Sequence, residues 1–389
     1  MTSPSAPTAP RLAVIGGGQL ARMMAQPAIA LGLPLRLLAE AEGVSAAQVI
    51  GDHLVGDYRD LDTLRQVTQG CAVVTFDHEH VPTEHLHALE DAGIAVHPGP
   101  DALVHAQDKG VMRARLSALG VPCPRHALVT DPDDVAAFGF PAVLKTTRGG
   151  YDGKGVWVVS GVDECAEAFE TADRAGVQIL AEELVDFRRE LSALVARSPS
   201  GQAAAYPVVE STQVDGVCRE VIAPAPDLHP ELAGQAQAIA LRIAGELGVT
   251  GILAVELFET TDGRILVNEL AMRPHNTGHW SQDGAVTSQF ENHLRAVMDL
   301  PLGSPQPRNR WTVMVNILGG PAETGRLYDG FPHAMARDPF LRVHLYGKEL
   351  RPGRKVGHVN TYGDDLDDCL ERARHAAAWF RGDLGNESE

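Results

Sequence analysis

The chain has 389 residues, more than most single compact cores hold, so we expect two or three domains. Its 44% hydrophobic and 22% charged residues are typical of a globular protein, and the formal net charge of -18 argues against general nucleic-acid binding and favours a soluble protein of the cytoplasm. No apolar run approaches the roughly 18 residues of a membrane span, so no membrane partner is expected.

The chain start and the cysteines exclude two further classes. Residues 1–10 are rich in Ser, Thr, Pro and Ala without an apolar core, which predicts a disordered tail and no signal peptide. Five cysteines are scattered without a CxxC pair, so neither a disulfide framework nor a zinc site is expected.

The first domain is predicted from a strand, glycine, helix pattern. The apolar run 11–15 leads into Gly16-Gly17-Gly18, after which apolar residues have helical spacing. This order is typical of the phosphate-binding opening of a doubly wound α/β fold. Further apolar runs at 34–39, 72–76 and 93–96 predict a parallel sheet, and hence a Rossmann-like domain over residues 11–104.

A dinucleotide site is one interpretation of this opening. Gly16, Gly18 and Ala21 match the glycine fingerprint, and Glu40 or Glu42 stands where an acidic ribose ligand is expected. A lone fingerprint is weak evidence, so an NAD-dependent oxidoreductase is kept only as an alternative. We expect phosphate at the helix N-terminus in either case.

A glycine-rich loop stands at the centre of the next region. The pattern predicts one helix over 101–119, and then alternating strands and helices over 121–185 that suit a small mobile lid. Within the lid, two strand-like runs flank the loop 145–155, whose four glycines would let backbone N–H groups approach an anion. Lys145, Arg148 and Lys154 would add positive charge, although a solvated hairpin tip is the alternative.

Paired carboxylates follow in the segment 252–270. Two apolar runs flank Asp262-Gly263, a strong hairpin signal. With these residues as the turn, Thr261 faces Arg264 and Glu256 faces Glu269, an arrangement that needs a cation and suits Mg²⁺. A three-residue loop is the alternative, and it would place Glu256 opposite Asn268 and turn Glu269 away.

Two cationic segments complete the candidate site. Arg273, His275 and Asn276 lie in a loop directly after the carboxylates, where they would hold a small anion. The segment 346–358 gathers four cations in an otherwise acidic chain, so a phosphate pocket and a solvated turn are equally good interpretations. These four residues are Lys348, Arg351, Arg354 and Lys355.

Taken together, these motifs resemble the ATP-grasp enzymes. The words Gly16-Gly-Gly-Gln-Leu20, Gly149-Gly-Tyr-Asp-Gly-Lys-Gly155, His275-Asn-x-Gly-His-Trp280 and Arg351-Pro-Gly-Arg-Lys-Val-Gly-His358 are similar to those of the N5-carboxyaminoimidazole ribonucleotide synthase family. The resemblance runs from about residue 11 to about residue 380. It implies an α+β ATP-grasp domain over 105–305 and a small C-terminal substrate-binding domain over 306–385.

The resemblance also implies an activity. Such a ligase uses ATP and bicarbonate to carboxylate the exocyclic amine of 5-aminoimidazole ribonucleotide, through carboxyphosphate, in purine biosynthesis. It uses two Mg²⁺ ions, for which Mn²⁺ can substitute. A homodimer and a downstream mutase as pathway partner are expected. The alternatives are a formate-dependent glycinamide ribonucleotide transformylase of the same fold and a non-catalytic nucleotide-binding regulator.

Site residues are carried over by position. ATP would contact Lys109, Lys145, Gly149, Gly150, Tyr151, Asp152, Gly153, Lys154, Gly155, Glu182, Glu183, Leu184, Val185, Glu190, Gln213, Asn268 and Glu269. Magnesium would be held by Glu256, Glu269 and Asn268. The ribonucleotide would contact Gln19, Glu79, Tyr151, Asp152, Lys348, Arg351, Arg354 and Lys355. Arg273, His275 and Asn276 would hold bicarbonate or carboxyphosphate, and Asp152 would orient the amine and accept its proton.

Two words depart from the family pattern. The acidic word after the third strand, usually Glu-x-Glu-Asn, is Asp77-His78-Glu79-His80 here, so only Glu79 is carried over. Gln213 stands where a histidine of the nucleotide site is expected, which weakens the assignment of that loop.

Overall fold

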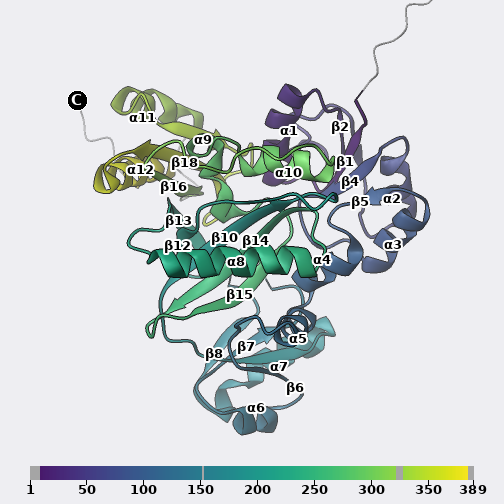
Figure 1. Cartoon of the computed structure of the whole chain (residues 1–389), viewed down its shortest axis with the longest axis vertical. Coiled ribbons are helices and arrows are strands. Elements are labelled where there is room, and N and C mark those ends of the chain that lie inside the picture. The colour runs from purple at the N-terminus through teal and green to yellow at the C-terminus, as the bar shows by residue number, and fades with distance from the viewer. Residues whose placement is uncertain (1–8, 151–152, 321–326, 384–389) are drawn as a thin grey trace, which may run out of the picture.

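The computed structural model describes residues 9–150, 153–320 and 327–383 (Figure 1). Its first part is a five-stranded parallel sheet in the order β3-β2-β1-β4-β5, which confirms the doubly wound fold predicted for the N-terminal region. The strands are β1 (Leu12–Ile15), β2 (Leu35–Ala39), β3 (His53–Val55), β4 (Val73–Phe76) and β5 (Ala95–Val96), joined by helices α1 (Gln19–Leu31), α2 (Leu61–Thr68) and α3 (Thr83–Asp91).

The single helix predicted over 101–119 is wrong, because two helices occupy this stretch. Helix α4 (Pro100–Gln107) ends before Asp108, whose backbone is extended. The Asp108 carboxylate accepts a hydrogen bond from the Val111 amide and caps a new helix, α5 (Lys109–Ala118). The break places Lys109 in the first turn of a helix that faces the candidate site.

The lid is a four-stranded antiparallel sheet in the order β6-β9-β7-β8, at the bottom of the view in Figure 1. It consists of β6 (His126–Val129), α6 (Pro132–Phe138), β7 (Ala142–Thr146), β8 (Val156–Val159), α7 (Ala166–Ala175) and β9 (Ile179–Glu183). A small apolar core of its own, which includes Leu144, Val159 and Ala168, holds this unit together.

A nine-stranded sheet forms the centre of the molecule. Its main order is β15-β14-β10-β12-β13-β16-β18-β17, and β11 pairs with β10. Strands after residue 306 therefore continue the same sheet, because β16 pairs with β13. The bounds are β10 (Phe187–Arg197), β11 (Ala203–Ala205), β12 (Val209–Val214), β13 (Val217–Ala223), β14 (Gly251–Thr260), β15 (Ile265–Ala271), β16 (Trp311–Leu318), β17 (Arg342–Leu345) and β18 (Lys355–Gly363).

Helices cover this sheet and join it to the first domain. Helix α8 packs on β10 and β14, α12 packs on β16 and β18, and α10 contacts α1 of the N-terminal sheet. Phe290 and Leu294 share an apolar cluster with Met24, which fixes the N-terminal domain against the centre. The remaining bounds are α8 (Pro230–Glu246), η2 (Asn276–Gly278), α9 (Ser281–Gly284), α10 (Gln289–Val297), η3 (Leu327–Gly330), α11 (Phe331–Arg337) and α12 (Leu366–Arg381).

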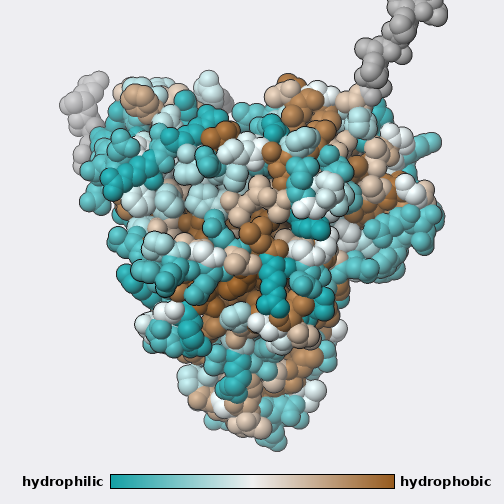
Figure 2. Space-filling view, viewed as in Figure 1, coloured by the Kyte–Doolittle hydropathy of each residue, from teal (hydrophilic) through white to brown (hydrophobic). Residues whose placement is uncertain are grey.

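The face drawn in Figure 2 is largely hydrophilic over the lid and the C-terminal helices, while hydrophobic residues gather in the middle, around α8 and the central sheet. Among the residues that the structure describes, no helix is long and apolar enough to cross a membrane.

Candidate active site

A cavity of about 1770 Å³ lies between the N-terminal domain, the lid, the central sheet and the C-terminal basic segment. All but one of the predicted site residues that the structure describes line this cavity. The exception is Gly155, where a Cβ would lie 2.5 Å from the Thr146 hydroxyl. Tyr151 and Asp152 lie outside the described residues. Four segments far apart in the sequence therefore meet where the motifs predicted one site.

The turn of the carboxylate hairpin differs from the prediction. Gly263 donates its amide to the Thr260 carbonyl, and Thr260 donates to the Arg264 carbonyl. The loop thus has three residues, and the predicted pairing of Thr261 with Arg264 is wrong. Without a further irregularity, this loop would place Glu256 opposite Asn268.

A β-bulge restores the predicted pairing of the carboxylates. Leu257 pairs with Val267, but Glu256 pairs with Glu269, so Asn268 is the extra residue on its strand. At a bulge, the strict alternation of side chains along the strand is interrupted. Asn268 and Glu269 therefore both line the cavity, where an unbroken strand would turn one of them away.

The two glutamates form a donor set that fits a hard divalent cation. Burial, followed by the nearby carboxylates of Glu269 and Glu190, raises the pKa of Glu256 to about 8. A bound cation would relieve this repulsion, and two carboxylates with the amide oxygen of Asn268 are the oxygen ligands that Mg²⁺ prefers. Within the described ranges no three His, Cys, Asp or Glu side chains gather as a metal site, so phosphates and water would supply the other ligands.

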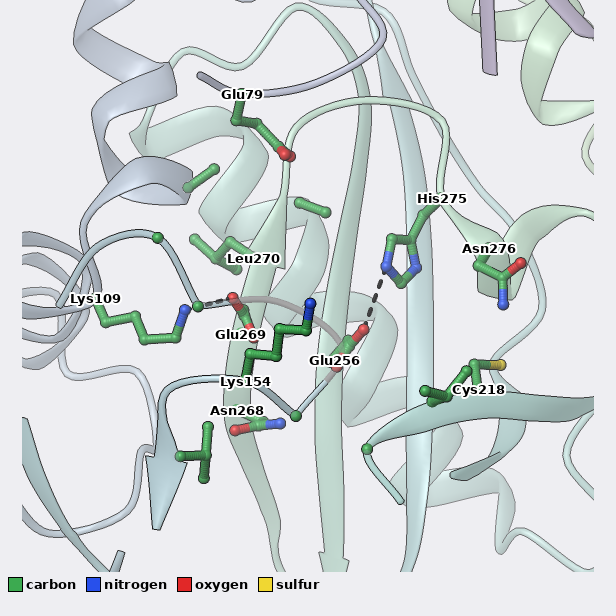
Figure 3. A pocket seen from close by; sticks show the side chains of 18 of the residues that line it. Glu79, Lys109, Lys154, Cys218, Glu256, Asn268, Glu269, Leu270, His275 and Asn276 are labelled. Carbon is green, nitrogen blue, oxygen red and sulfur yellow. Dashed lines mark hydrogen bonds and ion pairs between the residues drawn. The ribbon is translucent and has the colours of Figure 1, made fainter. Parts of the chain in front are cut away.

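Two lysines neutralise the cavity end of the hairpin. Lys109 Nζ lies 2.8 Å from Glu269 Oε1 (Figure 3). Lys145 Nζ lies 3.0 Å from Asn268 Oδ1 and 2.7 Å from Glu182 Oε2. Although burial raises the pKa of Glu182, the charges of Lys145 and Arg113 lower it to about 2. The cationic groups predicted to meet phosphates are thus positioned by carboxylates on two different elements.

Arg113 is the residue of this region that the sequence did not single out. It lies on α5, 1% exposed, and donates to Glu182 and to the backbone carbonyls of Val267 and Asn268. The sequence did contain a signal that Arg113 is buried. This residue follows Met112 and precedes Leu116 by three positions, and these two apolar residues mark the buried face of the helix.

The lid side of the cavity holds the predicted nucleotide residues. Residues 182–185 run from β9 along the cavity wall, as expected for the connector. Burial raises the pKa of Glu190 to about 7, against the opposing charge of Lys145. Gln213 Nε2 donates to the Ser211 hydroxyl at 3.1 Å and lines the same wall.

The predicted anion-binding loop is already engaged by carboxylates. Arg273 Nε donates to Glu79 Oε2 at 2.8 Å, and Glu79 Oε1 accepts from the Met272 amide. His275 Nε2 lies 3.3 Å from Glu256 Oε1 (Figure 3), and burial lowers the pKa of His275 well below its usual range. Both amide atoms of Asn276 are buried without a hydrogen-bond partner.

The C-terminal basic segment reaches the N-terminal domain. Lys348 donates to Gln19 across the cavity. Arg351 pairs with Glu349, and Arg354 donates to the Glu349 carbonyl at 3.3 Å. Together with Lys355, these cations line the cavity and are called the basic rim below.

The start of α1, where a phosphate was predicted, already holds a carboxylate. Two of its amides, those of Gly18 and Ala21, donate to the carboxylate of Asp77 at 2.9 and 2.8 Å. Glu40, the candidate ribose ligand, accepts instead from the Gly17 amide at 3.0 Å. A second anion at this helix N-terminus would meet the carboxylates of Asp77 and Glu40, so the glycine fingerprint gives no support to a dinucleotide site.

Three family models match successive parts of the chain. Residues 10–107 match a ribonucleotide synthetase preATP-grasp domain, residues 114–290 an ATP-grasp domain, and residues 312–372 a phosphoribosylaminoimidazole carboxylase C-terminal domain.

Characterised relatives cover nearly the whole chain. An N5-carboxyaminoimidazole ribonucleotide synthase of Mycobacterium tuberculosis is 55% identical over 377 residues, which are 96% of this chain and 88% of the relative. The same enzyme of Corynebacterium ammoniagenes is 52% identical over 379 residues, covering 95% and 92% of the two chains.

Solved structures agree with these relatives. The synthetase of Thermus thermophilus superposes with a TM-score of 0.85 at 37% identity, covering 97% of this chain and 100% of that one. The Aspergillus clavatus enzyme, solved with ADP and 5-aminoimidazole ribonucleotide, superposes with a TM-score of 0.86 at 29% identity, covering 96% and 99%.

Proposed function

The chain belongs to the N5-carboxyaminoimidazole ribonucleotide synthase family of ATP-grasp enzymes, and from that premise we propose how its own residues carry out the family's reaction. This reaction is the ATP-dependent carboxylation of 5-aminoimidazole ribonucleotide in purine biosynthesis. The observation that carries the proposal is the pairing of Glu256 with Glu269 beside two lysines, in one cavity with the C-terminal cations.

ATP lies between the lid and the central sheet in this proposal. The connector 182–185 holds adenine, and Glu190 accepts hydrogen bonds from the ribose hydroxyls. Lys109 and Lys145 exchange their present carboxylate and amide partners for phosphate oxygens, which keeps each ammonium group paired throughout. The loop 149–155 closes over the phosphates.

Magnesium would be held by Glu256, Glu269 and Asn268, which all line the cavity. When bound, Mg²⁺ would neutralise charge on the transferring phosphoryl group and orient it. Glu256 would then be ionised, because the cation would offset the burial and the carboxylate repulsion that keep its pKa high.

Bicarbonate and the ribonucleotide occupy the opposite end. Bicarbonate attacks the γ-phosphorus of ATP to give carboxyphosphate and ADP, and the closed loop excludes water from this labile intermediate. Arg273 and the residues His275 and Asn276 lie beside it. The ribonucleotide phosphate meets the cations of the basic rim, while Gln19 and Glu79 face the rest of the molecule. Asp152, beyond the described residues, is retained as the base that accepts the amine proton.

A product assay tests this function. Purified protein is incubated with ATP, Mg²⁺ and bicarbonate, with and without 5-aminoimidazole ribonucleotide, and in parallel with formate plus glycinamide ribonucleotide. We expect ADP to form when 5-aminoimidazole ribonucleotide and bicarbonate are present, and not with formate plus glycinamide ribonucleotide. ADP formation that requires formate and glycinamide ribonucleotide would instead assign the transformylase alternative.

We also propose a cytoplasmic homodimer. The five cysteines are free thiols, which suits a reducing compartment, and two-fold dimers are the commonest assemblies of soluble enzymes. The mutase remains a pathway partner that consumes the product. Light scattering of the purified protein would give its mass, and a monomeric mass would overturn the assembly.

A further inference from the structure

Arg113 connects three elements that the candidate site needs. Its side chain is 1% exposed and runs from α5 to β9 of the lid and to β15 of the central sheet. Nε donates to Glu182, NH1 to the Val267 carbonyl at 3.0 Å, and NH2 to the Asn268 carbonyl at 2.7 Å. One guanidinium thus uses its three nitrogens on a carboxylate and two backbone oxygens.

The two carbonyls that Arg113 binds are those of the bulge. Val267 is the last residue of β15 that pairs with β14 before the bulge, and Asn268 is the inserted residue. A bulge interrupts the ladder and leaves backbone groups without their strand partners, so these oxygens need other donors. A planar guanidinium supplies two donors at a fixed spacing, which a single ammonium group does not.

The side chain of Asn268 is held from the other direction. Lys145 Nζ donates to Asn268 Oδ1 at 3.0 Å and contacts Glu182 Oε2 at 2.7 Å, while the other oxygen of Glu182 accepts from Arg113. Glu182 therefore joins the residue that fixes the backbone of Asn268 to the residue that fixes its side chain. Arg113, Glu182, Lys145 and Asn268 thus form a closed ring of contacts. This ring fixes the direction in which the Asn268 side chain points, and with it the position of Glu269 next along the strand.

We propose that Arg113 is a positioning residue of the metal and ATP-phosphate site, acting by locking the β15 bulge so that Asn268 and Glu269 both face the cavity. This inference rests on the proposed function, because it assumes that these oxygens meet Mg²⁺ and nucleotide. Arg113 itself touches neither, and it does not line the cavity.

A purely structural role predicts a different result. A buried arginine that only stabilises the fold would, when replaced, lower the melting temperature and leave the metal affinity of the folded protein unchanged. A positioning role predicts weaker metal binding in protein that is still folded. Arg189 is a matched control, because its side chain is 11% exposed, bonds Glu210, Glu259 and the backbone carbonyl of Pro226, and does not line the cavity.

The experiment compares Arg113→Lys and Arg189→Lys with the unmodified chain. Mn²⁺ binding in the presence of ADP is titrated by electron paramagnetic resonance at a temperature where all three are folded, and KM is measured for ATP and for the ribonucleotide. For Arg113→Lys we expect Mn²⁺ affinity to fall and KM for ATP to rise by about 10-fold or more, the range seen when a group that orients a metal ligand is lost. KM for the ribonucleotide should change by less than about 2-fold.

Arg189→Lys should lower the melting temperature without changing Mn²⁺ affinity. Mn²⁺ affinity of folded Arg113→Lys within about 2-fold of the unmodified chain would overturn the positioning role. If Arg113→Lys does not fold, a double variant, Arg113→Gln with Glu182→Gln, removes both buried charges together. Comparing its Mn²⁺ affinity with that of Glu182→Gln alone tests the same carbonyl contacts. The binding arm needs no carboxylation, so a protein that binds Mn²⁺ and ADP but fails the product assay rejects the proposed function and still decides the role of Arg113.

Discussion

Glu256 is the single side chain on which the proposed chemistry depends most directly. It faces Glu269 across the hairpin, and burial, followed by the neighbouring carboxylates, raises its pKa to about 8. We expect Glu256→Gln to lower kcat by at least about 100-fold, because the amide keeps the shape but loses the charge that binds Mg²⁺. Near-normal turnover with unchanged circular dichroism would show that the metal assignment is wrong.

The same carboxyl predicts a pH dependence of stability. Its pKa is raised to about 8 in the folded chain, from 4.5 for the ordinary group. Between these values the folded state holds a proton that the unfolded state has lost, so this group makes stability fall as pH rises. Glu256→Gln lacks this group. Without Mg²⁺, the melting temperature of the unmodified chain should therefore fall relative to that of Glu256→Gln as the pH rises from 5 to 8, which widens the gap between them.

This widening is specific to the metal-free protein. Saturating Mg²⁺ with ADP should stabilise the unmodified chain and reduce the gap, because the cation favours the ionised carboxyl that the variant lacks. A constant gap across this pH range, measured by thermal denaturation, would contradict the raised pKa.

Single residues were predictable where chemistry and spacing coincide. Lys145, Glu190 and Glu269 were assigned from the sequence and all line the cavity. Arg113 was missed because an arginine inside a helix is usually solvated, and its partners lie up to 155 positions away in the sequence. Arg273 was found, but its pairing with Glu79 is a tertiary contact that no local pattern specifies.

The carboxylate hairpin shows how elements differ from residues in this respect. Its existence follows from the apolar runs and the Asp262-Gly263 signal, and the Glu256–Glu269 pairing predicted from them is the observed one. The loop is one residue longer than predicted, and a bulge one residue long cancels the change. The turn type depends on local φ and ψ, whereas the bulge depends on contacts with Arg113 of α5. The predicted register was therefore right, but the three-residue loop and the bulge that produce it were not predicted.

The opening of α1 carries a prediction at the scale of an element. A Cβ on Gly18 would lie 2.0 Å from Asp77 Oδ2, although the backbone of Gly18 is in an ordinary extended region. Gly18→Ala should therefore lower the free energy of unfolding by about 1–3 kcal/mol through steric overpacking and loss of the Asp77 cap.

Gly234→Ala is the matched control, since a Cβ there meets nothing within 4 Å and the position is inside helix α8. It should raise stability by up to about 1 kcal/mol from helix propensity alone. Urea denaturation of both variants measures the difference. Equal stability of the two would mean that Asp77 moves aside without cost.

On the scale of the whole molecule, the cavity exists only because four regions meet. The N-terminal domain supplies Gln19 and Glu79, the lid supplies Lys145, the hairpin supplies the carboxylates, and the last region supplies the basic rim. The sequence predicted each contributor through its motif, but the continuity of the central sheet from β15 to β17 was not visible in it. Pairing between β13 and β16 joins segments that are far apart in the chain, and strand order of this kind is set by long-range packing.

This arrangement predicts that the two substrates can be separated by mutation. Lys348 bonds Gln19 of the N-terminal domain at the basic rim, whereas Lys109 and Lys145 bond side chains of β15 and β9. We expect Lys348→Ala to raise KM for the ribonucleotide by about 10-fold or more, since a charge-assisted hydrogen bond to phosphate contributes on the order of 1.5–3 kcal/mol. KM for ATP should stay within about 2-fold.

Arg337→Ala is the control. It removes an exposed cation that pairs with Glu371 outside the cavity, and it should leave both KM values unchanged. Steady-state kinetics with each substrate varied in turn measures the split, and a larger effect on ATP than on the ribonucleotide would place the acceptor elsewhere in the cavity.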